Sequence, residues 1–594
     1  MKGPPAPRPK FETLNAALAA AAADSSGLTF VNIREEEQVL PWAEVYRRAR
    51  RAASALIRLG IRRGDRVVVI LPTGPSFMDA FFGTLLAGAV PVPLYPPLRL
   101  GRLDEYHAAT ARMVMLVGAR VVVSDARLRR LLGKAIEASR PALGCITAEA
   151  LIDDTDEAEA QPHSLCLIQF SSGSTVDPKP VALSQENLLA QCAILNSVIN
   201  ASATEREVGV SWLPLYHDMG LIGCLLSAVY YPAPLVLIPP ENFLARPSLW
   251  PRAISRHRGT ASAAPSFGYS LCLHRIKDAE LEGVDLSSWR IALNGAEPVS
   301  MKVMRKFGKR FSAWGFNPRA LTPGYGLAEA TLAVTYSAPE RPVQALSIDP
   351  LELARQGEAR DGNFEIASVG PPVPGVEVEV RGERGEALPE RRVGNIFVRG
   401  PSVMVGYFGN PRATARALQG GWLDTGDLGF VENGELYICG RAKDLVIIRG
   451  ANHQPQEFEA CVDSLDGVRT GCVVALGFTP EGGDAEELLI LAERAPRKRI
   501  VHLAPETGAG CTNLEERIRK AVLDGTGVRA HTVKILEPGT LPRTSSGKMR
   551  RREALRRFLS NELAPPQPVN VLRLAGKLVQ SALAYAKIEL GREG

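Results

Sequence analysis

Residues 167–189 read LIQFSSGSTVDPKPVALSQENLL. The apolar run Leu165–Phe170 predicts a buried strand, Val181–Leu183 predicts a second strand, and Ser184–Leu188 predicts the start of a helix. Between the strands, four hydroxyl side chains surround one glycine, and Lys179 follows. Such a turn suits a polyanion, because hydroxyl and backbone N–H donors can reach phosphate oxygens and lysine adds a positive charge. A serine- and glycine-rich surface turn is the alternative for these residues taken alone.

The composition is that of a globular chain with large cores. Of 594 residues, 45% are hydrophobic and 23% are charged, and the net charge is +6. So small a charge on a chain of this size argues against nucleic acid as the main partner. The nine cysteines form no CxxC pair and the eight histidines form no HxxxH or Cys/His cluster. We therefore expect a reduced protein without a structural zinc.

The sequence carries no signal that directs it into or across a membrane. Its first residues, MKGPPAPRPKFETL, lack the apolar core of a signal peptide. No uninterrupted run reaches the roughly 18 apolar residues that a spanning helix needs. We therefore expect a cytoplasmic protein with no membrane span.

Strand and helix patterns alternate over the first 336 residues. Trp42–Leu59 and Ser76–Ala87 predict helices, while Arg66–Leu71 and Arg120–Val123 predict strands. The same alternation continues over 165–336. This spacing is typical of an α/β fold with a mostly parallel, helix-covered sheet.

The pattern changes after residue 336. Residues 337–366 are polar and weakly patterned, with one short helix predicted at Pro350–Gln356. Short strand patterns with Gly/Pro turns over 376–438 then predict a small antiparallel β subdomain. A boundary is expected near Gly440, so the first domain covers 1–440.

Two further units follow the predicted boundary. Residues 441–560 predict a smaller, mobile α+β domain, and 561–594 hold a Pro-rich linker and an amphipathic helix. The apolar stripe of that helix, Asn570–Leu590, runs through Leu574, Leu578, Ala582 and Tyr585. Docking on the same protein is favoured, with self-association, a partner groove or a membrane surface as alternatives.

Seven motifs, in this order and spacing, resemble the adenylate-forming superfamily of acyl-CoA synthetases, peptide-synthetase adenylation domains and luciferases. They are SSGSTVDPKPVALSQENL (171–188), SWLPLYHDMGLIG (211–223), NGAEP (294–298), YGLAEAT (325–331), WLDTGDLG (422–429), GRAKDLVIIRG (440–450) and LPRTSSGKMRR (541–551). Within that superfamily, PVPLYPP, WLPLYHDMGLIG and GANHQPQEFE look most like fatty acyl-AMP ligases. The resemblance covers the chain to about residue 560.

The resemblance implies a two-step reaction with ATP and Mg²⁺. A fatty acid is activated to acyl-AMP with release of pyrophosphate, and a thiol then takes the acyl group. The implied phosphate-binding residues are Ser172, Gly173, Ser174, Thr175 and Lys179. Glu329 corresponds to the family's Mg²⁺ contact, and one carboxylate with phosphate oxygens and waters suits that ion.

The resemblance also assigns the nucleotide and the reacting carboxylate. Nucleotide binding falls on Gly295, Ala296, Glu297, Tyr325, Gly326, Thr331, Asp427 and Arg441. Tyr325 would stack on adenine and Asp427 would accept both ribose hydroxyls. Lys548 would bridge the attacking carboxylate and the α-phosphate, with His217 beside it.

The acyl chain and the domain movement are implied in the same way. Phe267 and Gly268 correspond to the wall of an acyl pocket, and Lys443 to the hinge between the domains. An insertion that disfavours coenzyme A would lie at about 338–365. The implied acceptor is therefore the phosphopantetheine thiol of a separate acyl carrier protein. The arginines after Lys548 could meet such an acidic carrier or form a solvated face.

Two features depart from this family or imitate another one. The phosphate loop usually reads STGxPKG, but Val176 and Pro180 replace both glycines. Valine disfavours positive φ and proline removes an N–H, so we expect a stiffer loop with one donor fewer. Asp463-Ser464-Leu465 imitates a phosphopantetheine attachment site by chance. Two alternatives to a fatty acyl-AMP ligase that loads a carrier protein stay open: a fatty acyl-CoA synthetase and a non-catalytic nucleotide- or acyl-adenylate-binding protein.

Overall fold

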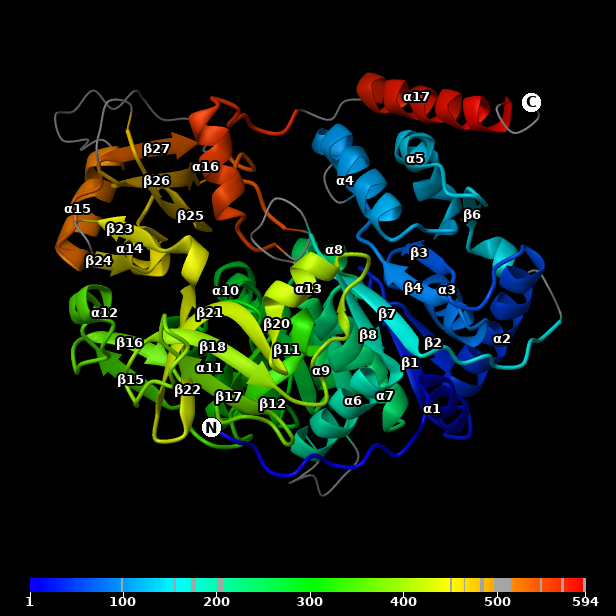
Figure 1. Ribbon diagram of the computed structural model, residues 1–594, viewed down its shortest axis with the longest axis horizontal. Helices are drawn as coiled ribbons and strands as arrows, with labels where there is room; N and C mark the ends of the chain where they lie inside the picture. The colour runs from blue at the N-terminus through cyan, green and yellow to red at the C-terminus, as the bar shows by residue number, and fades with distance from the viewer. Residues whose placement is uncertain are drawn as a thin grey trace.

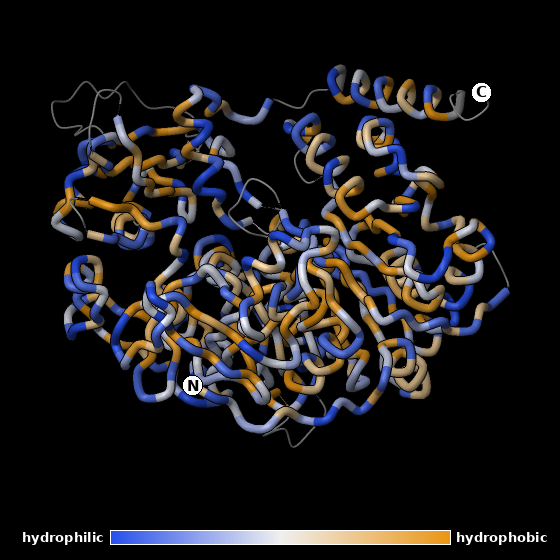
Figure 2. The backbone as a smooth tube through the Cα atoms, in the orientation of Figure 1, coloured by the Kyte–Doolittle hydropathy of each residue, from blue (hydrophilic) through white to orange (hydrophobic). Residues whose placement is uncertain are grey.

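The computed structural model describes most of the chain. The described ranges are 1–97, 100–152, 156–171, 178–199, 207–448, 451–463, 465–480, 485–495, 514–544, 547–567 and 571–590. Within these ranges, no helix combines the length and apolarity that crossing a membrane requires. Figure 2 shows apolar residues concentrated along the interior strands, with hydrophilic residues on the outer turns.

An eight-stranded, mostly parallel sheet forms the centre of the fold. Its interior pairings are parallel, and the outer strands β2 and β14 run antiparallel to their neighbours. The order is β14 (Ala333–Tyr336), β13 (Leu321–Gly326), β12 (Ile291–Asn294), β11 (Ala261–Ala264), β9 (Gly209–Ser211), β10 (Leu235–Leu237), β1 (Gly27–Val31) and β2 (Glu37–Pro41). Continuous apolar strands are expected where helices cover such a sheet.

A second sheet is parallel throughout its four strands. Its order is β4 (Val90–Pro93), β3 (Arg66–Ile70), β5 (Val121–Ser124) and β6 (Cys145–Thr147). Helices α2 (Trp42–Arg58) and α3 (Pro75–Leu86) pack on each other beside it. These elements confirm the predicted α/β class, and their bounds differ from the predicted ones by one or two residues.

The opening motif forms a short antiparallel sheet. β7 (Leu165–Phe170) pairs with β8 (Pro180–Ser184), and β19 (Gly406–Tyr407) pairs with the other edge of β8. Helix α6 (Gln185–Ile199) follows β8. It is capped reciprocally, because the Asn187 amide donates to Ser184 Oγ and Asn187 Oδ1 accepts from the Ser184 amide.

The predicted small β subdomain is a five-stranded antiparallel sheet. It consists of β17 (Glu377–Arg381), β18 (Gly394–Arg399), β21 (Trp422–Glu432), β20 (Leu418–Gln419) and β22 (Glu435–Arg441). β22 ends at the boundary expected near Gly440.

The segment 337–366 is more ordered than its pattern indicates. Helix α12 (Pro350–Gln356) has the predicted bounds, but it is flanked by a hairpin of β15 (Ala345–Ile348) and β16 (Phe364–Ala367). The prediction omitted the hairpin. Its apolar residues form one core with β21 and β22 that includes Ile348, Leu353, Phe430, Tyr437 and Cys439. Such short strands are stabilised by this packing rather than by local propensity.

Residues after 441 build a compact α+β unit, at the upper left in Figure 1. β25 (Val468–Phe478), β26 (Glu487–Arg494) and β27 (Thr532–Leu536) form its main sheet, and β23 (Val446–Ile448) pairs with β24 (Ala451–His453). Helices α14 (Pro455–Asp463), α15 (Leu514–Thr526) and α16 (Arg551–Leu559) accompany them. The unit has an apolar core of its own, with Phe458, Ile490 and Ile518.

Helix α17 (Val571–Leu590) returns to the N-terminal part of the molecule. It packs on α5 (Ala126–Ser139), as Figure 1 shows at the upper right. Ser581 and Ala584 are buried there, and Tyr585 donates its hydroxyl to the Arg129 carbonyl. The helix is therefore docked on its own protein, although Ala582 is exposed rather than part of the contact face.

Candidate active site

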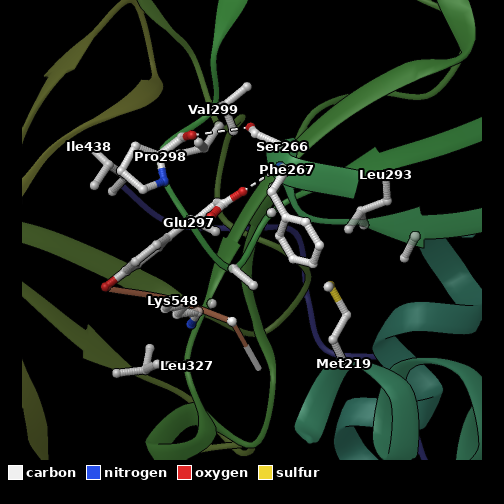
Figure 3. Close-up of a pocket in the computed structure, with 18 of the residues that line it drawn as sticks. Met219, Ser266, Phe267, Leu293, Glu297, Pro298, Val299, Leu327, Ile438 and Lys548 are labelled. Atoms are coloured by element: carbon white, nitrogen blue, oxygen red, sulfur yellow. Dashed lines mark hydrogen bonds between the residues drawn. The ribbon is translucent and has the colours of Figure 1, made fainter. Parts of the chain in front are cut away.

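A large, partly open cavity is lined both by residues of the N-terminal sheets and by residues of the unit that begins after residue 441. Its volume is about 2530 Å³. Pockets for one small ligand are typically about 300–1,000 Å³, so this cavity has room for more than one group. Figure 3 shows Glu297 and Lys548 on one side of the space and Phe267 and Met219 on the other. Leu327 and Ile438 also lie on the side of the two charged residues, which we call the polar side, and we call the opposite side the apolar side.

Tyr325, Asp427 and Arg441 form a connected group on the polar side. The Tyr325 hydroxyl donates to Asp427 Oδ2 at 2.7 Å, and Arg441 Nε lies 3.0 Å from Asp427 Oδ1. Asp427 and Arg441 are opposite each other in the β21–β22 pairing, whereas Tyr325 comes from β13. Burial raises the pKa of Asp427, and the Arg441 charge opposes that shift.

The loop after β12 brings Gly295, Ala296 and Glu297 to the cavity. Ala296 has φ +68, and a Cβ on Gly295 would lie 2.9 Å from the Gly324 carbonyl oxygen. The Glu297 carboxylate accepts the Phe267 amide at 2.6 Å, drawn as a dashed line in Figure 3. Burial raises the pKa of Glu297. The close approach of two backbones is what a small residue at 295 permits.

Lys548 enters the same cavity from the other side of the predicted hinge. Its loop is closed by two hydrogen bonds, from the Thr544 amide to the Lys548 carbonyl at 2.8 Å and from the Lys548 amide to Thr544 Oγ1 at 3.0 Å. Burial lowers the pKa of the Lys548 ammonium, and the Asp218 carboxylate is the first of the charges that oppose this. Figure 3 shows the lysine beside Glu297.

His217 lies on the cavity wall next to Asp218, whose side chain sequence analysis did not single out. His217 Nδ1 is 2.6 Å from Asp218 Oδ1. Both residues are 9% exposed. The only sequence signal for Asp218 was its place beside the histidine in LYHDMG.

Lys179 and Glu329 lie on a common wall, joined by Tyr407. Lys179 Nζ is 4.5 Å from the centre of the Tyr407 ring, and the Tyr407 hydroxyl donates to Glu329 Oε1 at 3.0 Å. Tyr407 was not predicted. It reaches this position because β19 pairs with β8 one residue beyond Pro180, with Tyr407 opposite Val181.

The turn between β7 and β8 is described only at its ends. Ser172, Gly173, Ser174, Thr175 and Val176 lie outside the described residues, so their predicted phosphate contacts stay predictions. Pro180 is the first residue of β8, and the Ser171 amide donates to the Lys179 carbonyl just before it. Proline is tolerated at the first position of a strand, which accounts for its replacing the usual glycine without breaking the pairing.

The structure gives two predicted site residues other surroundings. Thr331 is fully buried and its hydroxyl donates to the Ser402 carbonyl, so it does not line the cavity through which a phosphate contact was expected. Gly268 likewise does not line the cavity. A Cβ there would lie 2.6 Å from the Trp212 ring, so this glycine makes room for a tryptophan that itself lines the cavity. Phe267, Gly326 and Lys443 do line it, and their roles in acyl-chain binding, nucleotide binding and the hinge stay predictions.

Three arginines of the basic helix α16 form ion pairs with carboxylates of the same chain. Arg551 pairs with Glu459 at 2.7 Å, Arg556 with Glu553 at 3.0 Å, and Arg557 with Glu105 at 2.7 Å. These three arginines are therefore engaged, which weakens the idea that the whole run receives an acidic carrier. Among the described residues, no group of three or more His, Cys, Asp or Glu side chains is arranged to hold a metal ion.

Comparison with known proteins places these features in context. A family model described as AMP-binding enzyme matches residues 18–408. A putative acyl-CoA synthetase of Caulobacter vibrioides is 36% identical over 568 residues, covering 93% of this chain and 96% of the relative. A medium-chain-fatty-acid–[acyl-carrier-protein] ligase, TtuA of Teredinibacter turnerae, is 31% identical over 84% of this chain and 86% of its own length.

A solved structure gives the same picture of the fold. It comes from a study of fatty acyl-adenylate ligases from E. coli and L. pneumophila, with TM-score 0.85 and 32% identity. The match covers 94% of this chain and 99% of that one, so it extends past the family model and includes the unit that carries Lys548.

Proposed function

This chain belongs to the family of AMP-binding enzymes, and from that premise we propose that it activates a fatty acid with ATP and transfers the acyl group to a carrier protein. The observation that carries the proposal is the meeting of Lys548 with Tyr325, Glu297 and Asp427 around one cavity. Its first product would be acyl-AMP, with pyrophosphate released. Its second step would form a thioester on the phosphopantetheine of a separate acyl carrier protein.

The polar side of the cavity suits the first step. A carboxylate oxygen of the fatty acid attacks the α-phosphorus of ATP, and the bond to pyrophosphate breaks. Two anions must approach each other, so a cation at the meeting point stabilises the charge that develops. Lys548 supplies it, while Asp427 and Tyr325 are placed to hold ribose and adenine so that the reacting atoms are aligned.

The wall formed by Lys179 and Glu329 suits the remaining phosphates. Lys179 supplies positive charge, and its pKa is lowered by burial against the attraction of Glu329. Glu329 would hold Mg²⁺, for which one carboxylate completed by phosphate oxygens and waters is a sufficient ligand set. When bound, the ion would neutralise phosphate charge. Tyr407 fixes the orientation of the Glu329 carboxylate through its hydroxyl.

The apolar side suits the acyl chain. Trp212, Met219, Phe267 and Leu293 line it, and the Trp212 ring packs edge-on to Phe267 at 5.7 Å between centroids. A saturated chain needs apolar contact and no specific hydrogen bond. In this proposal the carboxyl end of a fatty acid lies between the apolar side and Lys548.

The proposed acceptor is supported by the segment 337–366 and its place before the hinge. The hairpin β15–β16 is anchored on β21 and β22 just before the hinge at Lys443, and α12 packs beside β24 of the following unit. We infer that residues 441–560 move as a domain about Lys443 and that this anchored segment restrains the movement. Such restraint disfavours free coenzyme A and favours a carrier that docks.

The test is a mass-spectrometric assay for acyl-AMP with Mg-ATP and a panel of fatty acids. Coenzyme A, or a carrier protein that bears a free phosphopantetheine thiol, is then added. We expect acyl-AMP to accumulate, to survive coenzyme A and to be consumed by the carrier. Lys548→Gln should form almost none, whereas Lys534→Gln, an exposed lysine of the same unit, should match the parent.

The relative named as a putative acyl-CoA synthetase favours one alternative, a fatty acyl-CoA synthetase. Rapid conversion of the acyl-AMP to acyl-CoA would support it over carrier loading. If no acid yields acyl-AMP and Lys548→Gln is indistinguishable from the parent, the chain binds nucleotide without turnover.

A further inference from the structure

Asp218 lines the cavity next to His217. It precedes the helical segment η3 (Met219–Leu226), and its Oδ1 accepts the Met219 amide at 2.7 Å as well as lying 2.6 Å from His217 Nδ1. Its side chain is 12% exposed. A carboxylate this buried is costly unless it is hydrogen-bonded and faces positive charge.

Among the described residues, the second nitrogen of His217 has no partner. Nε2 is buried and makes no hydrogen bond to that part of the chain, although His217 lines the cavity. Because Nδ1 is held by Asp218, the ring orientation is set and Nε2 is the nitrogen left for a ligand. An unpartnered buried polar atom in a cavity wall indicates that a bound group completes it.

Asp218 also lines the same cavity as Lys548, which belongs to the unit after residue 441. The charge of Lys548 lowers the pKa of Asp218 together with His217, against the effect of burial. Conversely, Asp218 is the first of the charges that oppose the lowering of the Lys548 pKa by burial, ahead of Glu297 and Asp427, while Arg441 acts in the opposite direction. One carboxylate is therefore linked to both side chains proposed to meet the fatty acid.

We propose that Asp218 is the positioning residue for adenylation: its carboxylate orients His217 so that Nε2 meets the fatty carboxyl group, and it supplies the negative charge that holds the Lys548 ammonium in the cavity. This inference rests on the proposed function. It assigns Asp218 no contact with the substrate. Its effect passes through His217 and Lys548, which line the same cavity, and burial would otherwise destabilise the charge of the lysine.

The test is the pH profile of acyl-AMP formation in the full-length chain. Asp218→Asn keeps the shape of the side chain and an oxygen for the Met219 amide, but removes the charge. We expect the alkaline limb of the profile to move down by about one pH unit, since Lys548 loses its proton more easily, and the rate at pH values well above the limb to fall about tenfold.

Two further variants separate positioning from folding. His217→Asn removes the imidazole and leaves the Asp218 charge, so we expect a higher KM for the fatty acid with the alkaline limb unmoved. Asp278 is an exposed aspartate paired with Arg310, so Asp278→Asn should change neither the KM for the fatty acid nor the alkaline limb. Melting temperatures of all variants show whether the fold is retained.

The outcomes are distinct. A uniform loss of rate in Asp218→Asn with an unmoved limb would mean a merely structural residue and overturn the inference, as would a limb that moves in His217→Asn by the same amount. Absence of acyl-AMP from the parent would overturn the proposed function itself. Parent activity with an unmoved limb in Asp218→Asn would overturn only the role of Asp218.

Discussion

The hydroxyl of Tyr325 donates to Oδ2 of Asp427 at 2.7 Å, joining the end of β13 in the large sheet to β21 in the small antiparallel sheet. Arg441 pairs with the other oxygen of the same carboxylate. Both oxygens are therefore oriented before any nucleotide arrives, and each keeps a lone pair for a ribose hydroxyl. The two residues proposed for adenine and ribose are held as one unit.

The hydrogen bond between Tyr325 and Asp427 predicts different effects when each residue is substituted. Tyr325→Phe keeps the aromatic face and loses the hydrogen bond, so we expect the KM for ATP to rise about two- to fivefold, in line with a net hydrogen bond of about 0.5–1 kcal/mol. Asp427→Asn should raise it at least tenfold, because one ribose acceptor becomes a donor. Pyrophosphate release against ATP concentration measures both. Equal effects from the two variants would contradict the separate roles.

Lys548 should contribute strongly to the rate of acyl-AMP formation and little to folding stability. Removing its charge with Lys548→Gln is expected to lower kcat for acyl-AMP formation by about 10²-fold or more, because it removes a cation needed where charge develops. Since burial destabilises the charged form in the unliganded protein, the melting temperature should stay the same or rise. A large fall in melting temperature would show that the lysine mainly holds the units together.

The anchored segment 337–366 predicts a change in acceptor. Leu353 of α12 is 8% exposed in the core with β21 and β22, whereas Leu351 of the same helix is 36% exposed. Leu353→Ala removes buried contacts worth about 2–3 kcal/mol. We expect it to increase acyl-CoA formation several-fold with acyl-AMP formation unchanged. Leu351→Ala is the matched control and should resemble the parent, and an unchanged acyl-CoA rate in both would count against the restraint.

The docking of α17 depends on one glycine. The Gly133 amide donates to Ser581 Oγ at 2.8 Å, and a Cβ on Gly133 would lie 2.3 Å from the Ser581 carbonyl oxygen. Gly133→Ala should therefore displace α17 at a cost of about 1–3 kcal/mol. Limited proteolysis should cut the helix faster, with a lower melting temperature.

A second glycine provides the control for that experiment. Nothing lies within 4 Å of a Cβ on Gly576, which is an exposed residue of α17. Alanine favours a helix by up to about 1 kcal/mol over glycine. Gly576→Ala should accordingly slow the proteolysis of α17. If both variants behave alike, the Gly133–Ser581 contact does not hold the helix.

The pH dependence of stability should include a contribution from α16. Arg556, with Arg557, lowers the pKa of Glu553 from 4.5 to about 2. Because the pKa is depressed in the folded state, the stabilisation is present above about pH 4.5 and is lost as pH falls through about 2. Glu553→Gln should lose about 1 kcal/mol at pH 6, after allowance for solvent screening, and differ little from the parent near pH 2. Urea unfolding at the two pH values measures this, and an equal difference at both would refute it.

The predictable part of the structure is the part with strong local patterns. The long apolar and amphipathic runs predicted α2, β3 and α3 to within one residue. The short helix α12 was predicted with its observed bounds, although its segment is weakly patterned. The hairpin β15–β16 was missed because its four-residue strands become stable only on β21 and β22. Tyr407 was missed for a similar reason, since a two-residue strand brings it to Lys179.

The sequence by itself determined the class of fold and the types of side chain available, because hydrophobic periodicity and ordered motifs are local properties. Only the tertiary structure decided which of those side chains meet. It joined Tyr325 to Asp427 and brought Asp218 and Lys548 to one cavity, but directed the Thr331 hydroxyl to the Ser402 carbonyl. The physical reason is that such contacts join residues far apart in the chain, so burial and charge act on them only after the sheets have packed.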